Sequence, residues 1–316
     1  KINSRAYAFD LELDFESITG FINQRPIPSR YPDNGSSATS FAIYLNWIFE
    51  LNKRLNLNAG LRLTSSNLNG NWNKIASVDK LLSSVKLDSE ALTYTLAITY
   101  RPNKKLQFNS LLSSGFRNPN IDDIGKIREN NGILLVPNSF LKPEYAYTFE
   151  SGIKIRSNNQ KNYFDLRGFS TLVSRHIVRS DFIVFSDTST EDQNTIIYNG
   201  DEVLTQANKN LGNRFIYGLC LDGKLSLGSL MKLYGGVNFT SSDKNSDYGP
   251  MPSIAPFFGA ITFSSQYRKW SNFLIWKFSA SKKPRDYSWG GEDGLNETPI
   301  IDPNASLEID RFYGMP

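Results

Sequence analysis

Residues 41–64 read FAIYLNWIFELNKRLNLNAGLRLT, and this stretch decides the fold class. Large apolar residues occupy every second position over 41–51, and the same pattern returns over 55–63 after a short polar segment. Successive side chains of a β-strand point to opposite faces, so a period of two predicts strands with one apolar and one more polar face. Two such strands joined by a short turn predict an antiparallel hairpin.

The same alternation recurs along the chain and predicts about eleven strands. They lie at about 6–15, 41–51, 55–64, 92–100, 104–114, 147–156, 161–179, 206–226, 230–241, 257–268 and 271–281. Short connections alternate with long polar ones, of which 115–144 and 180–206 are examples. This order predicts an all-β, up-and-down antiparallel sheet with turns at one end and loops at the other. A helical period appears only weakly, at 75–85.

The apolar face could meet either lipid or a second sheet. Aromatic residues lie beside the short turns, as in the girdles of outer-membrane barrels: Trp47, Phe49, Tyr100, Tyr163, Tyr267 and Trp270. Asp10, Arg62 and Lys154 lie on the polar face and suit a wet lumen. Several strands exceed the usual length of about five or six residues. We therefore favour a lipid-facing barrel, although aromatic residues also simply favour strands in a soluble β-sandwich.

Composition excludes several other classes of protein. The chain has 316 residues, one cysteine, one histidine and a formal net charge of +4. These counts exclude a disulfide framework and a histidine-rich metal site, and they give no support to nucleic-acid binding. No run of 18 apolar residues predicts a transmembrane helix. No nucleophile elbow or other catalytic constellation occurs, so we expect no enzyme activity, no catalytic residue, no bound metal and no cofactor.

Two motifs flank the long connection at 115–144. Residues 115–119 read GFRNP and residues 138–144 read NSFLKPE, after which a new alternating strand begins. This pair resembles TonB-dependent outer-membrane receptors, in which the first motif ends a strand and the second opens the next. The residues at matching positions are Phe116, Arg117, Pro119, Asn138, Leu141, Lys142, Pro143 and Glu144. Residues 248–259 and 283–293 resemble late-loop patterns of Bacteroidetes receptors of this family.

The resemblance implies an antiparallel transmembrane barrel of 22 strands that encloses a plug domain. We expect residues 1–316 to be the C-terminal half of such a barrel, with about eleven strands and incomplete at both ends. The N-terminal plug would be absent from this chain. The implied location is the bacterial outer membrane, with the lipid bilayer as a partner.

The implied function is active transport of a scarce nutrient. A ferric chelate or siderophore, cobalamin or a glycan would bind outside, and the TonB system would supply energy through the missing N-terminal region. Two alternatives stay open. One is a passive outer-membrane pore or surface-binding barrel, and the other is a soluble β-sandwich that binds carbohydrate.

Candidate ligand-binding residues lie in the expected external loops. Arginine can pair with carboxylates or phosphates, and Tyr and Trp can stack on rings. The candidates are Arg117, Arg128, Arg175, Tyr248, Arg285 and Trp289, together with Lys126, Arg179 and Tyr287. The simpler and favoured alternative for each is a solvated loop residue, and for the motif prolines a role only in shaping the junction between strand and loop.

The single histidine and the single cysteine are not predicted to be functional residues. We expect His176 to be a surface residue and Cys220 to be a small strand residue. Family members that carry haem have a histidine between the two motifs. Residues 120–137 contain none, so haem uptake has less support.

Overall fold

The computed structural model describes residues 2–6, 10–15, 22–27, 31–32, 34–72, 84–184, 194–198, 200–243, 251, 254–280 and 305–313. Twelve strands form the main sheet: β1 (Ile2–Ala6), β4 (Ser36–Asn52), β5 (Leu55–Asn71), β6 (Ser84–Tyr100), β7 (Leu106–Arg117), β10 (Glu144–Arg156), β11 (Tyr163–Ser174), β15 (Asn213–Leu227), β16 (Met231–Ser242), β17 (Phe257–Tyr267), β18 (Trp270–Ser279) and β19 (Ala305–Tyr313). The remaining elements are β2 (Asp10–Phe15), β3 (Ile22–Ile27), α1 (Ile121–Ile124), β8 (Arg128–Asn130), β9 (Ile133–Leu135), β12 (Ile177–Asp181), β13 (Thr195–Tyr198) and β14 (Asp201–Asn210).

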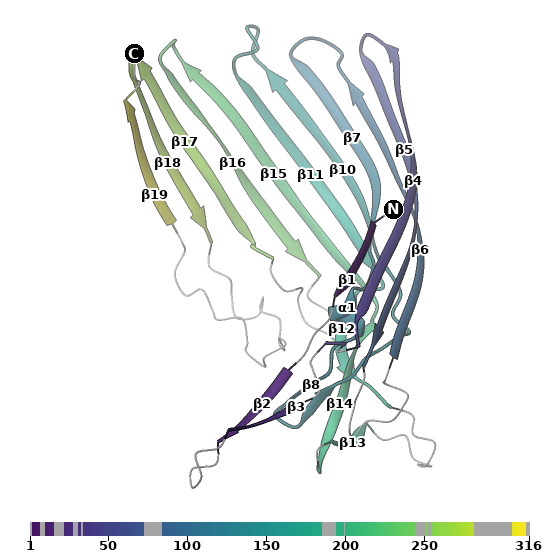
Figure 1. Cartoon of the computed structure of the whole chain (residues 1–316). Coiled ribbons are helices and arrows are strands. Elements are labelled where there is room, and N and C mark those ends of the chain that lie inside the picture. Colours follow the sequence, from purple (N-terminus) through teal and green to yellow (C-terminus); the bar gives the residue numbers. More distant parts are fainter. Residues whose placement is uncertain are drawn as a thin grey trace.

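The main sheet is an antiparallel wall. Its neighbours follow the order β1-β4-β5-β6-β7-β10-β11-β15-β16-β17-β18-β19, so β1 and β19 form its two edges. Figure 1 shows a curved, open sheet with short turns at one end and long connections at the other. This arrangement confirms the predicted all-β, up-and-down antiparallel barrel architecture.

Two long predicted strands are each divided between two sheets, which corrects the strands expected at 161–179 and 206–226. β11 ends at Ser174 and the chain turns at Arg175, whose φ is +58°, before β12. Likewise, β14 and β15 are separated by Gly212 with a φ of +65°. A residue in the left-handed region interrupts strand geometry, so the alternation continues while the pairing partner changes.

The N-terminal prediction is also corrected in part. The strand expected at 6–15 is two elements, because β1 pairs with β4 whereas β2 pairs with β3 in a separate two-stranded sheet. Residues 7–9 lie outside the described residues. So does most of the weak helical pattern at 75–85, since only its last two residues are described, and they belong to β6.

One face of the main sheet is apolar and exposed. Phe41 and Ile43 are 59% and 58% exposed, and Phe149 is 52% exposed. Cross-strand neighbours share this face: Phe149 lies opposite Leu112 of β7, and Leu172 lies opposite Phe215. No second sheet covers this face in the described part of the chain. The soluble β-sandwich alternative is therefore wrong, because its apolar faces would be packed together.

The buried hydrophobic core lies at the loop end rather than beneath the wall. A small sheet of order β12-β14-β9-β8, with β13 paired to β14, covers it. The cluster consists of Trp72, Val85, Leu87, Ile124, Ile127, Leu134, Val136, Leu141, Val203 and Ala207. The connections expected as plain loops at 115–144 and 180–206 therefore contain α1, β8, β9, β13 and part of β14. We call the small sheet with α1 the loop subdomain.

The longest strands carry the loop subdomain. β4, β5 and β6 have 17 residues each. A strand tilted as in outer-membrane barrels crosses the apolar band in about 9–11 residues. The loop-end parts of these strands therefore project beyond the band. Among the described residues, no helix has the length and apolar character of a membrane span.

Glycine at position 235 permits close packing of β16 and β17. A Cβ atom there would lie 2.2 Å from the carbonyl oxygen of Ala260, whereas one at Gly223 would lie 3.6 Å from that of Tyr163. We expect Gly235→Ala to destabilise the folded barrel by about 1–3 kcal/mol, and Gly223→Ala to have little effect. The temperature at which the full-length barrel loses the fast electrophoretic mobility of its folded form measures this destabilisation. Equal midpoint temperatures of unfolding for the two variants would contradict the close packing of β16 and β17.

Candidate functional site

Arg117 joins the two sequence motifs. It is the last residue of β7, and its Nε donates to Oε2 of Glu144, the first residue of β10. Its Nη1 donates to Asp123 of α1 over 2.7 Å. Asp123 in turn closes a capping box with Asn120, which fixes the start of α1. The guanidinium therefore holds two strand ends and the first loop helix together.

Glu144 also binds the second long connection. Its Oε1 accepts a hydrogen bond from the Ile177 amide over 2.6 Å and lies 2.8 Å from Nδ1 of His176. The expectation that His176 is a surface residue is wrong, because its side chain is only 18% exposed. We call Arg117, Asp123, Glu144 and His176 the loop clamp. It connects β7, α1, β10 and β12 at the loop end, outside the membrane-spanning part of the wall.

The clamp sets the charge state of Glu144. Burial alone would raise the pKa of this carboxyl, but hydrogen bonds from His176, the Ile177 amide and Arg117 together lower the pKa to about 2. Burial also opposes the charged form of Arg117, yet Glu144 and Asp123 raise its pKa above the ordinary value. Opposite charges held in contact favour the ionised form of both partners. Glu144 is therefore a carboxylate throughout the physiological range.

The remaining motif residues lie in the framework of the loop subdomain. Leu141 is buried in its core, and Pro119 and Pro143 are buried as well. The Asn138 side chain donates to the carbonyl of Asn208 over 2.7 Å and accepts from the Phe140 amide. Each of these contacts shapes the junction between strand and loop.

Two further motif residues are more accessible. The ring of Phe116 lies 6.3 Å from that of Tyr145, at the loop-end edge of the apolar face. Lys142 is exposed, although its backbone amide is held by the side chain of Asn210 over 2.7 Å.

The structure places three of the six candidate ligand-binding residues. Arg117 belongs to the clamp, although its side chain is 47% exposed. Arg128 begins the edge strand β8, and Arg175 is exposed at the bend before β12. Tyr248, Arg285 and Trp289 lie outside the described residues, as does Tyr287. Ligand contact by any of the six stays a prediction.

Lys126 is not available to a ligand. Its side chain is 2% exposed, and its Nζ lies 3.0 Å from a carboxylate oxygen of Asp122. Asp122 also accepts a hydrogen bond from the hydroxyl of Tyr31 over 2.6 Å. Lys126 therefore belongs to the interior of the loop subdomain.

The polar face of the wall carries a second charged network. Lys154 lies 3.1 Å from Asp165, and Arg167 donates to Asp222 over 2.6 Å. Nearer the short turns, Arg101 and Arg156 both donate to Gln107. These side chains share one face by register, opposite the exposed apolar face. The wall is thus amphipathic across its thickness, as a barrel with a wet lumen requires.

Asn208, Asn210 and Asp123 are parts of the site that the sequence analysis missed. The Asn208 side chain donates to the carbonyl of Asp123 over 2.9 Å, and that of Asn210 donates to the carbonyls of Lys142 and Arg175. The segment Asn210-Leu211-Gly212-Asn213 contains the signal that could have revealed them. Two asparagines around a glycine mark a turn, which would have ended the predicted strand there.

The site offers groups suited to noncovalent binding. No group of three or more metal-binding side chains occurs in the part of the chain that the structure describes. Cys220 lies half-buried on β15, opposite Arg167 of β11 by register. The arrangement offers cations and aromatic rings at the loop end and a charged inner wall.

Comparison with protein families gives one match over nearly the whole chain. Residues 4–307 match the family model described as TonB dependent receptor-like, beta-barrel. The haemoglobin-haptoglobin utilization protein B of Neisseria meningitidis serogroup C is 23% identical over 301 residues, which cover 85% of this chain and 36% of that protein. The haemoglobin and haemoglobin-haptoglobin-binding protein of Haemophilus ducreyi is 26% identical over 163 residues, or 50% of this chain and 16% of that protein. The chain thus spans about a third of the first relative's length.

Solved structures agree on the fold. A mutant of the ferric enterobactin receptor PfeA from Pseudomonas aeruginosa, in complex with enterobactin, superposes with a TM-score of 0.64 at 13% identity, covering 99% of this chain and 51% of that one. The Serratia marcescens hemophore receptor HasR, with its hemophore and heme, gives 0.57 at 16% identity, covering 88% and 50%. These two relatives come from Neisseria and Haemophilus species, and a Bacteroidetes origin of this chain stays a prediction.

We expect Glu144→Gln to loosen the loop subdomain, because the neutral amide no longer pairs with Arg117 and His176. A lost charged hydrogen bond of this kind costs about 1–3 kcal/mol. Trypsin should then cleave faster after Arg175 and Arg179 in outer-membrane vesicles. Glu150→Gln on the same strand is the control and should keep the wild-type rate. Equal protection of all three proteins would contradict the clamp.

The lowered pKa of Glu144 predicts a specific dependence on pH. Because the folded-state pKa of about 2 lies below the ordinary value of 4.5, the carboxylate stabilises the loop subdomain above pH 4.5. This contribution is lost as the pH falls from 4.5 toward 2. Trypsin does not work in that range, so pepsin cleavage is the measurement. The difference in cleavage rate between wild type and Glu144→Gln should shrink across this window, and a constant difference would refute the charge assignment.

Proposed function

Because this chain belongs to the TonB-dependent receptor β-barrel family, we propose that it forms the wall and several external loops of a receptor for an iron-carrying nutrient. The barrels of this family lie in the bacterial outer membrane. The receptor would bind its ligand at the loop end and move it along the polar inner face. Energy would come from the TonB system through a region of the full-length protein outside these residues.

The amphipathic wall is the observation that supports transport most directly. Its apolar face is exposed and continuous, while its opposite face carries the pairs Lys154–Asp165 and Arg167–Asp222. Charged side chains on that face are satisfied if the face borders water or a polar domain. The family and fold are those of transport receptors, which speaks against an enzyme. No observation favours the passive-pore alternative over uptake.

The relatives support iron as the cargo. Two of them are named for haemoglobin and its haptoglobin complex, and structural neighbours include a receptor bound to enterobactin. Arg128 and Arg175 at the loop end could pair with anionic groups of a ferric chelate or of haem. Cobalamin and glycans remain weaker predictions, because no contact in the structure favours either.

Growth on defined iron sources tests this proposal. A strain that lacks the full-length gene should lose growth on haemoglobin, haem or a ferric siderophore as the sole iron source, and the gene on a plasmid should restore it. Growth on ferrous iron is the control, because porins pass it without this receptor. Unchanged growth of the deletion strain on each iron complex would contradict the proposal.

His176 distinguishes the kinds of cargo. Its Nδ1 pairs with Glu144, which leaves Nε2 as the only nitrogen that could ligate haem iron. Because only 18% of the side chain is exposed, we expect it to organise the loops rather than to ligate haem iron. His176→Gln should therefore reduce uptake of every cargo by a similar factor, and by no more than Glu144→Gln, because Glu144 also binds Arg117 and the Ile177 amide. A loss confined to haem, with trypsin resistance intact, would instead assign His176 to the cargo.

A further inference from the structure

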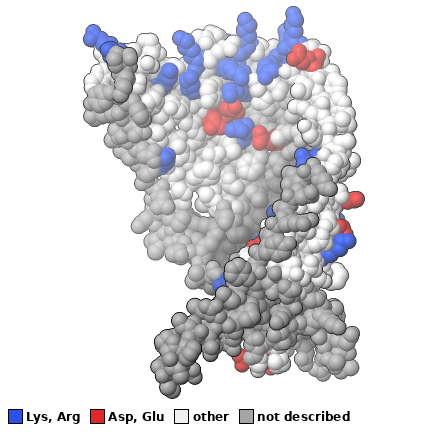
Figure 2. All heavy atoms as spheres, viewed as in Figure 1, with Lys and Arg blue, Asp and Glu red and all other residues white. Residues whose placement is uncertain are grey.

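The short-turn end of the wall carries a rim of positive charge. The turns between paired strands contain Lys53, Arg54, Arg101, Lys104, Lys105, Lys161, Arg268 and Lys269, and every one of these is exposed. None of the short turns, at 53–54, 101–105, 157–162, 228–230 and 268–269, contains Asp or Glu. Figure 2 shows blue side chains along this end of the molecule. We call these residues the basic rim.

The basic rim is not neutralised within the chain. Its members form no ion pair in the part of the protein that the structure describes, whereas most cations of the inner wall and loop clamp are paired. Like charges held along one edge repel one another, and an external anion relieves that repulsion. The rim therefore favours an anionic partner at the short-turn side.

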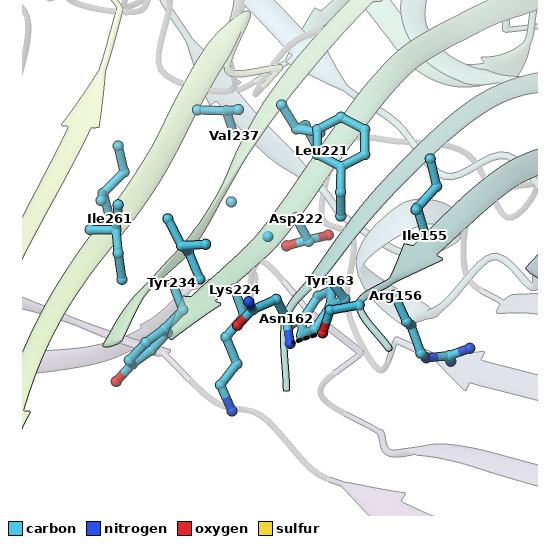
Figure 3. A pocket seen from close by; sticks show the side chains of 17 residues that line it. Ile155, Arg156, Asn162, Tyr163, Leu221, Asp222, Lys224, Tyr234, Val237 and Ile261 are labelled. Atoms are coloured by element: carbon cyan, nitrogen blue, oxygen red, sulfur yellow. Dashed lines mark hydrogen bonds between the residues drawn. The ribbon is translucent and has the colours of Figure 1, made fainter. Parts of the chain in front are cut away.

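An apolar hollow opens on the lipid-facing side of the wall beside this rim. Its volume is about 570 Å³, within the range of about 300–1,000 Å³ typical of ligand pockets. Figure 3 shows its residues, with Asn162 at the turn end. By register, the side chains that share the apolar face are Ile155, Phe164, Leu221, Leu225, Leu233, Val237 and Ile261.

Two glycines line the hollow, and Gly223 is the one that leaves open space. A Cβ atom at Gly223 would meet only the Tyr163 carbonyl oxygen at 3.6 Å, whereas at Gly235 the backbone of β17 lies 2.2 Å away. Gly223 of β15 and Gly235 of β16 lie opposite each other on the apolar face, so two neighbouring positions lack a side chain. Around them the wall keeps large apolar residues. Because the hollow lies on central strands and faces outward, it does not depend on how the sheet edges are completed.

Backbone contacts bring the rim to the mouth of the hollow. The Lys105 carbonyl accepts from the Arg156 amide over 2.7 Å, so the 101–105 turn lies beside the end of β10. Lys161 precedes Asn162, which lines the hollow and accepts from the Ser226 amide over 2.7 Å. Lys104, Lys105 and Lys161 are therefore the rim cations next to the apolar hollow.

We propose that this hollow and its adjoining cations bind an anionic phospholipid of the periplasmic leaflet. An acyl chain fills the hollow over Gly223 and Gly235, and the headgroup phosphate lies among Lys104, Lys105 and Lys161. Short turns of outer-membrane barrels face the periplasm, so the rim stands at the headgroup level of that leaflet. An acidic periplasmic protein would match the rim but not an apolar hollow that faces lipid. This pairing of charge and apolar surface commits the site to a lipid.

Native mass spectrometry of the full-length receptor tests the proposal, with phosphatidylglycerol or phosphatidylethanolamine added to the detergent micelles. The wild-type receptor should bind phosphatidylglycerol at least about fivefold more strongly, since each cation near an anionic headgroup contributes roughly that factor. A variant with Lys104, Lys105 and Lys161 replaced by Gln should lose this preference. Gly223→Leu should lower binding of both lipids by filling the hollow.

Matched controls separate lipid binding from misfolding. Lys86→Gln removes a cation from the loop end, and Ser170→Leu adds bulk to the same apolar face away from the hollow, so both should bind lipid like wild type. Each variant must keep the gel mobility of the folded barrel, and Lys161→Gln alone replaces the triple variant if that fails to fold. Equal wild-type binding of both lipids would overturn the proposal. Unchanged preference in the lysine variants would overturn it as well.

Discussion

The pairing of backbone groups is the constraint on which the rest of this structure depends. Lipid offers no hydrogen bonds, so each amide and carbonyl within the membrane must pair with another strand. Long antiparallel neighbours such as β5 and β6, paired over residues 55–71 and 84–100, meet that demand. Because pairing fixes the register, it also fixes the face of the sheet on which each side chain lies, with odd and even positions of a strand on opposite faces. One face becomes apolar and the other carries charges, which is the basis for the lipid contact and for the proposed transport path.

The same constraint explains why the hydrophobic core lies at the loop end. Within the membrane the apolar side chains face outward, so the wall itself buries little. Beyond the membrane, water surrounds the chain, and apolar residues such as Leu134 and Leu141 become buried as in a soluble protein. The loop clamp joins the membrane wall to the loop subdomain. Arg117 and Glu144 lie at the ends of wall strands, whereas Asp123 and His176 lie in the loops. In the proposed receptor, ligand binding at the loop end would therefore be coupled mechanically to the wall.

The sequence alone predicted the wall well, because the alternation of apolar and polar residues can be recognised within each strand without knowing its distant partners. Residues 41–64 contain the turn and the central part of a hairpin, in which the alternation predicts the face of each side chain. A bulge between Glu50 and Asn52, which the alternation does not reveal, shifts the register near the turn. The loop subdomain was not predictable in this way. The partners of Glu144 are 27 and 32 residues away, and β9 pairs in parallel with β14 some 70 residues later. Alternation even misled at 206–226, since apolar residues continue across Gly212 while the strand changes sheets.

The outward direction of the apolar face is the central claim, and spin labels on β10 test it most directly. Single cysteines at positions 147–155 of the full-length receptor, with Cys220 replaced by serine, would be labelled in lipid bilayers. The account predicts that odd positions collide mainly with oxygen dissolved in lipid, and even positions mainly with a water-soluble nickel chelate. Accessibility without a period of two, or with the opposite parity, would contradict it.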